Sequence, residues 1–139
     1  MTRTLVVLAG HGSLPSGMRD AVELILGEQP RLRVAELPPE QTPEGFRRHL
    51  LKVLDEGTPA VVLTDVFGGT PHNVAAVVAA GRDDVEVLTG LSLPMLVEVI
   101  TSGADRAREL AEVGVRAGRE GAMHTSLMTR VPPPGAVDG

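Results

Sequence analysis

Short apolar runs alternate along this chain with stretches in which apolar residues recur at helical spacing. Residues 4–9 form a nearly unbroken apolar run of the length of a strand that is buried on both faces. Between residues 16 and 28, by contrast, Met18, Val22 and Ile25 follow a period near 3.6. The expected strands are 4–9, 32–37, 59–64 and 85–89, and the expected helices are 16–28, 43–55, 71–80, 94–102 and 104–118.

Local signals support these boundaries. Thr42 followed by Pro43 is typical of a helix start, with the threonine as N-cap and the proline at the first helical position. The run 32–37 carries Arg33 and Glu36 among its apolar residues. Charged residues inside a strand are typical of the edge of a sheet, so we expect this strand at an edge.

Strands and helices that alternate with short connections form right-handed βαβ units and a parallel sheet. We therefore expect an α/β domain over residues 1–128 with a three-layer, doubly wound fold and helices on both faces. Its four parallel strands should run in the order second, first, third, fourth. Residues 121–128 have the length and partial alternation of a further strand, which would pair on a sheet edge. Residues 129–139, rich in Pro and Gly, predict a disordered tail.

Composition excludes several classes of function. The net charge of −5 over 139 residues argues against nucleic acid as a partner and suits a basic partner protein. With 0 cysteines, disulfides and thiolate chemistry are excluded. No apolar run has the length of a membrane span, and the start of the chain leads directly into a strand rather than a signal peptide. We therefore expect a cytoplasmic protein.

Two of the predicted strands are followed closely by an ionisable side chain. His11 comes just after the strand 4–9, between two glycines, and Asp65 follows the strand 59–64. The carboxyl ends of parallel strands form the ligand crevice, so these side chains are expected to meet there. A carboxylate on one ring nitrogen fixes the tautomer, makes the other nitrogen more nucleophilic and stabilises the positive charge of a phosphorylated ring. The pair predicts phosphoryl chemistry on the imidazole, and two locally capping residues are the alternative.

The residues after Asp65 form a candidate phosphoryl-binding loop. Gly68 and Gly69 allow the backbone to approach an anion closely. We expect Thr70 to cap the next helix and Pro71 to open it, so that free N–H groups favour a phosphate. An ordinary glycine turn before a capped helix is the alternative interpretation.

The remaining hydroxyl and imidazole groups are weaker candidates. Ser13, Thr64 and His72 are candidate supporting residues at the same edge of the sheet, whereas His49 is expected on a helix surface and His124 in the appended strand. The histidines lack metal-ligand spacing, and the G-x-x-x-x-G-K-[ST] phosphate loop is absent. We therefore expect no metal and no cofactor.

Three motifs resemble the enzyme IIA component of mannose-family sugar phosphotransferase systems. They are Gly-His-Gly-Ser at 10–13, Thr-Asp-Val-Phe-Gly-Gly-Thr-Pro at 64–71 with Asn73, and Thr-Gly-Leu-Ser-Leu-Pro-Met-Leu-Val-Glu at 89–98. The resemblance keeps the same order and similar spacing from about residue 3 to about residue 128.

The resemblance implies a cytoplasmic phosphocarrier. It would receive a phosphoryl group from the phosphohistidine of HPr and pass it to a IIB component, associated with IIC and IID membrane components. By correspondence, His11 is the phosphorylated histidine, Asp65 binds its ring, and Gly68, Gly69 and Thr70 hold the phosphoryl group. Family members are usually homodimers that exchange a C-terminal antiparallel strand, which would account for residues 121–128.

One departure and one absence qualify these expectations. His72 stands where the family commonly has an aromatic residue, which affects the partner interface more than the chemistry, and we expect this side chain to be exposed. No IIB domain follows in the sequence, so we expect that partner to be separate.

Three alternative functions stay open at this stage. The chain could be a regulator that accepts a phosphoryl group without sugar transport. A hydrolase would use Ser13 with His11 and Asp65, although Ser13 is only two residues from His11 and lacks the strand–elbow–helix setting of such a nucleophile. The third alternative is a non-catalytic anion-binding module.

Overall fold

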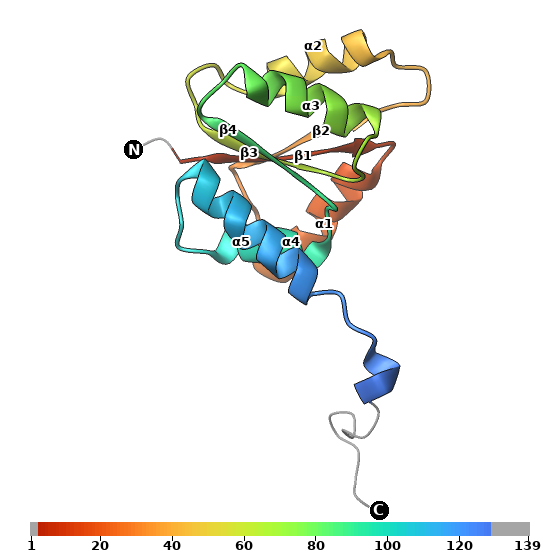
Figure 1. The fold of residues 1–139 in the computed structure, drawn as a ribbon, viewed down its shortest axis with the longest axis vertical. Helices are drawn as coiled ribbons and strands as arrows, with labels where there is room; N and C mark the ends of the chain where they lie inside the picture. Colours follow the sequence, from red (N-terminus) through yellow and green to blue (C-terminus); the bar gives the residue numbers. More distant parts are fainter. Residues whose placement is uncertain (1–2, 129–139) are drawn as a thin grey trace, which may run out of the picture.

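A computed structural model describes residues 3–128, in which a parallel sheet lies between two layers of helices (Figure 1). The sheet has four strands in the order β2-β1-β3-β4, with every neighbouring pair parallel. The expected strand order is therefore confirmed. The strands are β1 (Leu5–His11), β2 (Leu32–Leu37), β3 (Ala60–Thr64) and β4 (Val85–Thr89).

Burial follows the position of each strand in the sheet. The two central strands are apolar at almost every position, and Val7 of β1 lies opposite Val62 of β3, both fully buried. Strands β2 and β4 form the edges and are buried at only some of their positions. This is the pattern of a sheet covered on both faces, in which only the central strands have neighbours on every side.

Five helices cover the two faces of the sheet. Helices α2 and α3 pack on one face, where Phe46 and Leu50 are fully buried, and α1, α4 and α5 pack on the other, around Leu96 and Leu110 (Figure 1). The helices are α1 (Leu14–Leu26), α2 (Pro43–Val53), α3 (Thr70–Ala80), α4 (Leu93–Thr101) and α5 (Ala107–Glu120). None of them, within the part of the chain that the structure describes, is long and apolar enough to cross a membrane.

The helix caps confirm one expectation and correct another. Thr42 is the N-cap of α2, and its hydroxyl accepts a hydrogen bond from the N–H of Gly45 at 3.0 Å. Thr70, which was expected to cap α3, is instead the first residue of that helix, and the N-cap is Gly69. The backbone of Gly69 is extended (φ −72°, ψ 161°), as an N-cap requires, so the helix begins one residue earlier than the Thr-Pro signal suggests.

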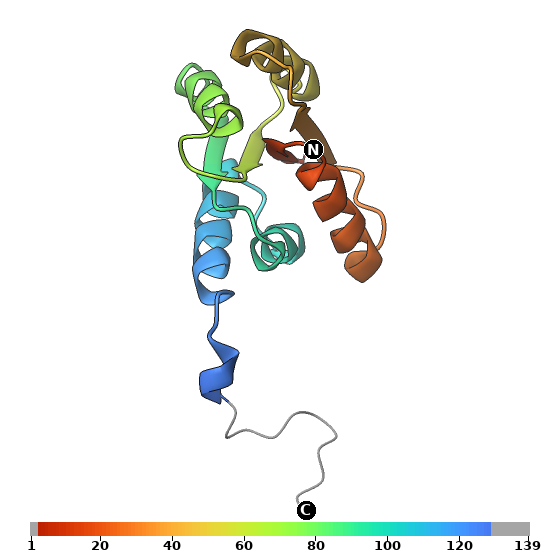
Figure 2. The same cartoon turned by 90° about the vertical axis from the view of Figure 1, so that its right-hand side faces the viewer.

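The expected strand over residues 121–128 does not form in this structure. Residues Thr125–Met128 make a 3-10 turn that stands away from the helical layers (Figure 1, Figure 2). A strand needs a sheet edge to pair with, and the chain leaves α5 in a direction that offers none, so the backbone bonds locally. Exchange of this segment between two chains stays a prediction, and the expected tail over 129–139 lies outside the described residues.

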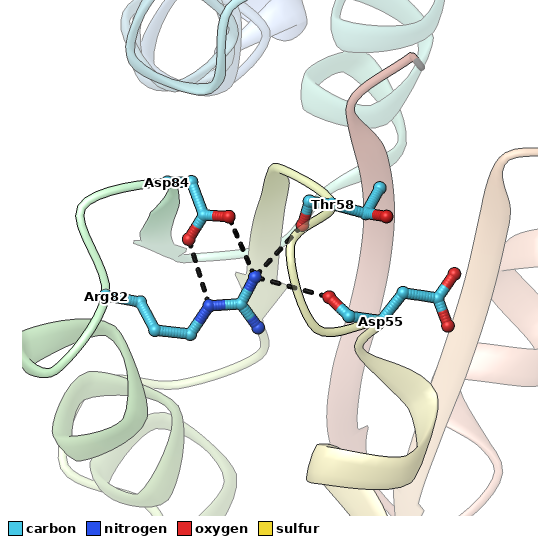
Figure 3. Close-up of polar contacts among 4 residues, drawn as sticks. All are labelled: Asp55, Thr58, Arg82 and Asp84. Atoms are coloured by element: carbon cyan, nitrogen blue, oxygen red, sulfur yellow. Dashed lines mark hydrogen bonds and ion pairs between the residues drawn. The ribbon is translucent and has the colours of Figure 1, made fainter.

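A polar tie closes the sheet at the amino ends of β3 and β4. The guanidinium of Arg82 donates to both carboxylate oxygens of Asp84 at 2.9 Å, and its Nη2 also donates to the carbonyls of Asp55 at 3.2 Å and Thr58 at 3.1 Å (Figure 3). The hydrogen-bonded ion pair between the two side chains raises the pKa of Arg82 and lowers that of Asp84. The tie joins the loop before β3 to the loop before β4, at the end of the sheet opposite the histidine.

Candidate functional site

His11 and Asp65 meet at the carboxyl end of the sheet. His11 is the last residue of β1, and Asp65 directly follows β3, the neighbouring strand. The ring Nδ1 of His11 lies 2.7 Å from Oδ2 of Asp65. The side chain of His11 is 50% exposed, whereas that of Asp65 is only 10% exposed. The largely buried carboxylate therefore holds one nitrogen of the ring, while the rest of the ring is open to solvent.

Three hydrogen bonds hold Asp65 and favour its charged form. Its Oδ2 accepts hydrogen bonds from the ring and from the backbone N–H of His11 (2.8 Å), and its Oδ1 accepts from the N–H of Val66 (2.9 Å). Burial raises the pKa of Asp65, but these hydrogen bonds outweigh it and hold the pKa below its ordinary value. A charged carboxylate on Nδ1 keeps the hydrogen of a neutral ring on that nitrogen, and the lone pair then lies on Nε2.

Two glycines make room for this pair. A Cβ on Gly69 would lie 2.9 Å from Cε1 of His11, and a Cβ on Gly10 would lie 3.2 Å from Oδ2 of Asp65. The first contact shows that the loop before α3 passes directly beside the imidazole. The absence of side chains at both positions thus lets the ring, the carboxylate and the loop approach one another closely.

The glycine loop is held by the first turn of α3. The side chain of Asn73 donates to the carbonyl of Gly68 at 3.0 Å, and the N–H of Gly68 points to Nδ1 of His72 at 3.4 Å. The ring of His72 also packs against Phe67, with ring centroids 4.9 Å apart. His72 is therefore half-buried rather than simply exposed, which corrects the expectation from the sequence. No role was predicted for Asn73, although it stands in the quoted motif.

The other candidate supporting residues do not join the site. Ser13 is exposed at the N-cap of α1, and among residues 3–128 no hydrogen bond joins it to His11, so the serine–histidine–aspartate arrangement of a hydrolase is not formed. Thr64 is fully buried, and its hydroxyl donates to the carbonyl of Leu88 at 2.8 Å. Its role is to tie β3 to β4.

Side chains that could bind a metal ion do not cluster in the described region. Within residues 3–128 no group of three or more His, Cys, Asp or Glu side chains is arranged to hold a metal ion. His49 and His124, the histidines outside the site, are both exposed.

Exposed apolar side chains stand close in sequence to His11 and Asp65. Val66 and Phe67, which lie between Asp65 and the glycines, are 53% and 77% exposed. Leu14, at the start of α1 just after β1, is 43% exposed. Apolar side chains left in solvent beside a reactive group are typical of a surface that another protein covers.

Comparison with known proteins gives one consistent result. Residues 5–113 match the EIIA-man family, described as "PTS system fructose IIA component", where PTS denotes the phosphotransferase system. The sorbose-specific EIIA component of Lacticaseibacillus casei is 30% identical over 96 residues, which are 68% of this chain and 70% of that protein.

A longer relative and a solved structure agree. The mannose-specific EIIAB component of Escherichia coli is 31% identical over 122 residues, which cover 84% of this chain but only 38% of that longer protein. The crystal structure of an EIIA component from Streptococcus agalactiae superposes with a TM-score of 0.84 at 27% identity, covering 89% of this chain and 98% of that one.

Proposed function

This chain belongs to the EIIA-man family of sugar phosphotransferase-system IIA components and is thus a phosphotransferase, and on that premise we propose that His11 carries the phosphoryl group. The observation that supports this assignment is the 2.7 Å contact between Nδ1 of His11 and Asp65. It leaves Nε2 as the free nucleophile on a ring that is half exposed.

In the transfer step, the lone pair of His11 Nε2 attacks the phosphorus of a phosphohistidine on the donor protein, which we propose to be HPr. A new N–P bond forms on Nε2 as the donor's N–P bond breaks, and the electron pair of the broken bond returns to the donor's ring nitrogen. The hydrogen on Nδ1 stays between the ring and Asp65 throughout. Because the phosphorylated ring is positive, the adjacent carboxylate stabilises it, and this is the role of Asp65.

The phosphoryl group would lie beside the start of α3. Gly69 passes next to Cε1 of His11, the ring atom between Nδ1 and Nε2, and therefore brings the helix N-terminus close to Nε2. The first-turn N–H groups of a helix have no partner inside the helix, and together with the helix dipole they attract a phosphate. The hydroxyl of Thr70, the first residue of α3, adds a further donor.

Both partners must reach the same nitrogen, so docking has to be transient. Exposed Val66 and Phe67 provide an apolar surface of the kind that a small, short-lived interface uses. We propose HPr as the donor and a separate IIB component as the acceptor, in the cytoplasm, with IIC and IID membrane components further along the route. A homodimer belongs to the same proposal.

Intact-mass analysis tests the assignment. The chain is incubated with enzyme I, HPr and phosphoenolpyruvate, in parallel with His11→Ala and with His49→Ala, a matched control on an exposed histidine of α2. We expect an acid-labile gain of about 80 Da, the mass of one phosphoryl group, in the wild type and in His49→Ala but not in His11→Ala. No gain in the wild type, or a gain in His11→Ala, would refute the proposal.

A further inference from the structure

His72 occupies the third position of α3, where a side chain often helps to cap the N-terminus of a helix. With Gly69 as N-cap, His72 is the third residue of α3. In the capping box this is the residue whose side chain reaches back to a backbone N–H before the helix. Here the imidazole reaches one residue further back than in a capping box, past the N-cap Gly69, and its Nδ1 lies 3.4 Å from the N–H of Gly68.

Neighbouring side chains thus hold both backbone groups of Gly68. His72 takes its N–H, and Asn73 donates to its carbonyl at 3.0 Å. Gly68 has a positive φ of 85°, and nothing lies within 4 Å of the place where its Cβ would be. Gly68 is the third residue of a turn closed by the N–H of Gly69, which donates to the carbonyl of Val66 at 3.2 Å, and the two side-chain hydrogen bonds add to this turn in fixing its orientation.

The orientation of Gly68 determines where the loop meets the reactive ring. The next residue, Gly69, lies so close to His11 that a Cβ added to it would be 2.9 Å from Cε1 of the ring. A rotation of the peptide between the two glycines therefore changes the distance from the loop, and from the start of α3, to Nε2. Transfer rates are sensitive to such displacements, because the attacking nitrogen and the phosphorus must be aligned within a fraction of an ångström.

We propose that His72 is a positioning residue for phosphoryl transfer, in which its Nδ1 accepts the N–H of Gly68 and, with Asn73, holds the glycine loop against His11. This role rests on the proposed function of His11. It also assigns the tautomer of His72. Nδ1 also lies 3.3 Å from Oδ1 of Asn73, and one nitrogen cannot both accept from Gly68 and donate to Asn73. The proposed role requires Nδ1 to accept from Gly68, and it therefore places the ring hydrogen on Nε2.

The imidazole of His72 makes a second contact that must be separated from the first. Its ring packs on Phe67 at 4.9 Å between centroids, and Phe67 is one of the exposed residues beside the site. Two substitutions divide these contributions. His72→Phe keeps a ring against Phe67 and removes the acceptor, whereas His72→Asn places a carbonyl oxygen near the position of Nδ1 and removes the ring.

Single-turnover phosphorylation by phospho-HPr, measured by rapid quench over a range of donor concentrations, separates the effect of the hydrogen bond to Gly68 from that of the packing on Phe67. In His72→Phe we expect the maximal rate to fall roughly fivefold, the usual effect of losing one hydrogen bond, with the half-saturating donor concentration unchanged. In His72→Asn we expect the maximal rate to be kept and the half-saturating concentration to rise, because the support for Phe67 is lost.

An independent measurement reports the hydrogen bond without any phosphoryl transfer. Exchange of the Gly68 amide hydrogen with water, followed by NMR, should be faster in His72→Phe than in the wild type and in His72→Asn. NMR of the wild-type ring should also place the hydrogen of neutral His72 on Nε2.

Several results would overturn the inference. They are an unchanged maximal rate in His72→Phe, an equal loss of rate in His72→Asn, equal Gly68 exchange in all three proteins, or a ring hydrogen on Nδ1. Failure of the wild type to accept a phosphoryl group would overturn the proposed function and this role together. The exchange of Gly68 distinguishes the two failures, because it depends on the hydrogen bond alone.

Discussion

Replacing Gly69 with alanine adds one methyl group where the loop touches the imidazole of His11. The new Cβ would lie 2.9 Å from Cε1 of His11 and 3.1 Å from Cγ1 of Val66. The backbone of Gly69, at φ −72° and ψ 161°, suits any residue, so the substitution introduces no backbone strain. The effect of Gly69→Ala is therefore confined to the contact with the ring and with Val66.

The size of the effect follows from that distance. An unstrained carbon–carbon contact is about 3.5 Å, so a separation of 2.9 Å must grow by about 0.6 Å. The ring cannot follow without lengthening its 2.7 Å bond to Asp65, and the loop cannot follow without moving the start of α3. A misplacement of about 1 Å costs a transfer reaction roughly 100-fold, so we expect a loss of roughly tenfold in rate. The free energy of unfolding should change by less than about 1 kcal/mol.

Rapid-quench phosphorylation of His11 by phospho-HPr measures the rate, and urea unfolding measures stability. Gly103→Ala is the matched control, because Gly103 lies between α4 and α5, has no positive φ, and has nothing within 4 Å of its Cβ position. We expect Gly103→Ala to transfer at the wild-type rate.

Two results would refute this reasoning. Transfer by Gly69→Ala at the wild-type rate would mean that the loop does not limit the position of the ring. A loss of rate that merely matches the unfolded fraction of Gly69→Ala would mean that the methyl group acts through stability and not through His11.

Three further predictions concern stability. Hydrogen bonds hold the pKa of Asp65 below its ordinary value, so the charged carboxylate stabilises the folded state. The wild type should therefore have a higher free energy of unfolding than Asp65→Asn above about pH 4. This difference should shrink as the pH falls through the lowered pKa of the folded state. Urea titrations at neutral and acid pH measure it. Phe46→Ala should cost roughly 3–5 kcal/mol in urea unfolding, because Phe46 is fully buried. Arg82→Met should lower the free energy of unfolding by about 1–2 kcal/mol, because it removes the hydrogen bonds between the loops before β3 and β4. It should leave the transfer rate unchanged, because these loops lie at the end of the sheet opposite His11.

Each of these has a contrary outcome. An advantage over Asp65→Asn that grows as the pH falls below about 4 would contradict the direction of the pKa shift. A cost below about 1 kcal/mol for Phe46→Ala would mean that the core under α2 collapses to fill the cavity. Slower transfer in Arg82→Met would mean that the two ends of the sheet are coupled.

The fold was largely predictable because its signals are local. Apolar runs, helical periodicity and turn residues predicted four strands and five helices, and each is found within about three residues of its expected ends. The mistake at Thr70 has the same local origin, because a Thr-Pro pair is a cap signal at 42–43 but the first helical residues at 70–71. Which of these a pair becomes depends on where the preceding loop turns into the helix: at 70–71 the extended N-cap conformation is already taken by Gly69, one residue earlier.

The segment 121–128 was not predictable from its own pattern. Partial alternation of apolar and polar residues indicates a strand only if a sheet edge is available to pair with. Within one chain, residues Thr125–Met128 of this segment make a 3-10 turn instead. Pairing is a property of two segments, so the sequence of one of them cannot decide it.

The site divides in the same way. The sequence alone determined which chemistry is available, because His11 and Asp65 stand at the carboxyl ends of two strands and a glycine pair follows. Only the tertiary structure decided that the carboxylate binds Nδ1, that Gly69 touches the ring, and that His72 turns back to the loop. The reason is physical: spacing along a chain sets which side chains share an end of the sheet, but hydrogen bonds depend on side-chain orientations that packing selects.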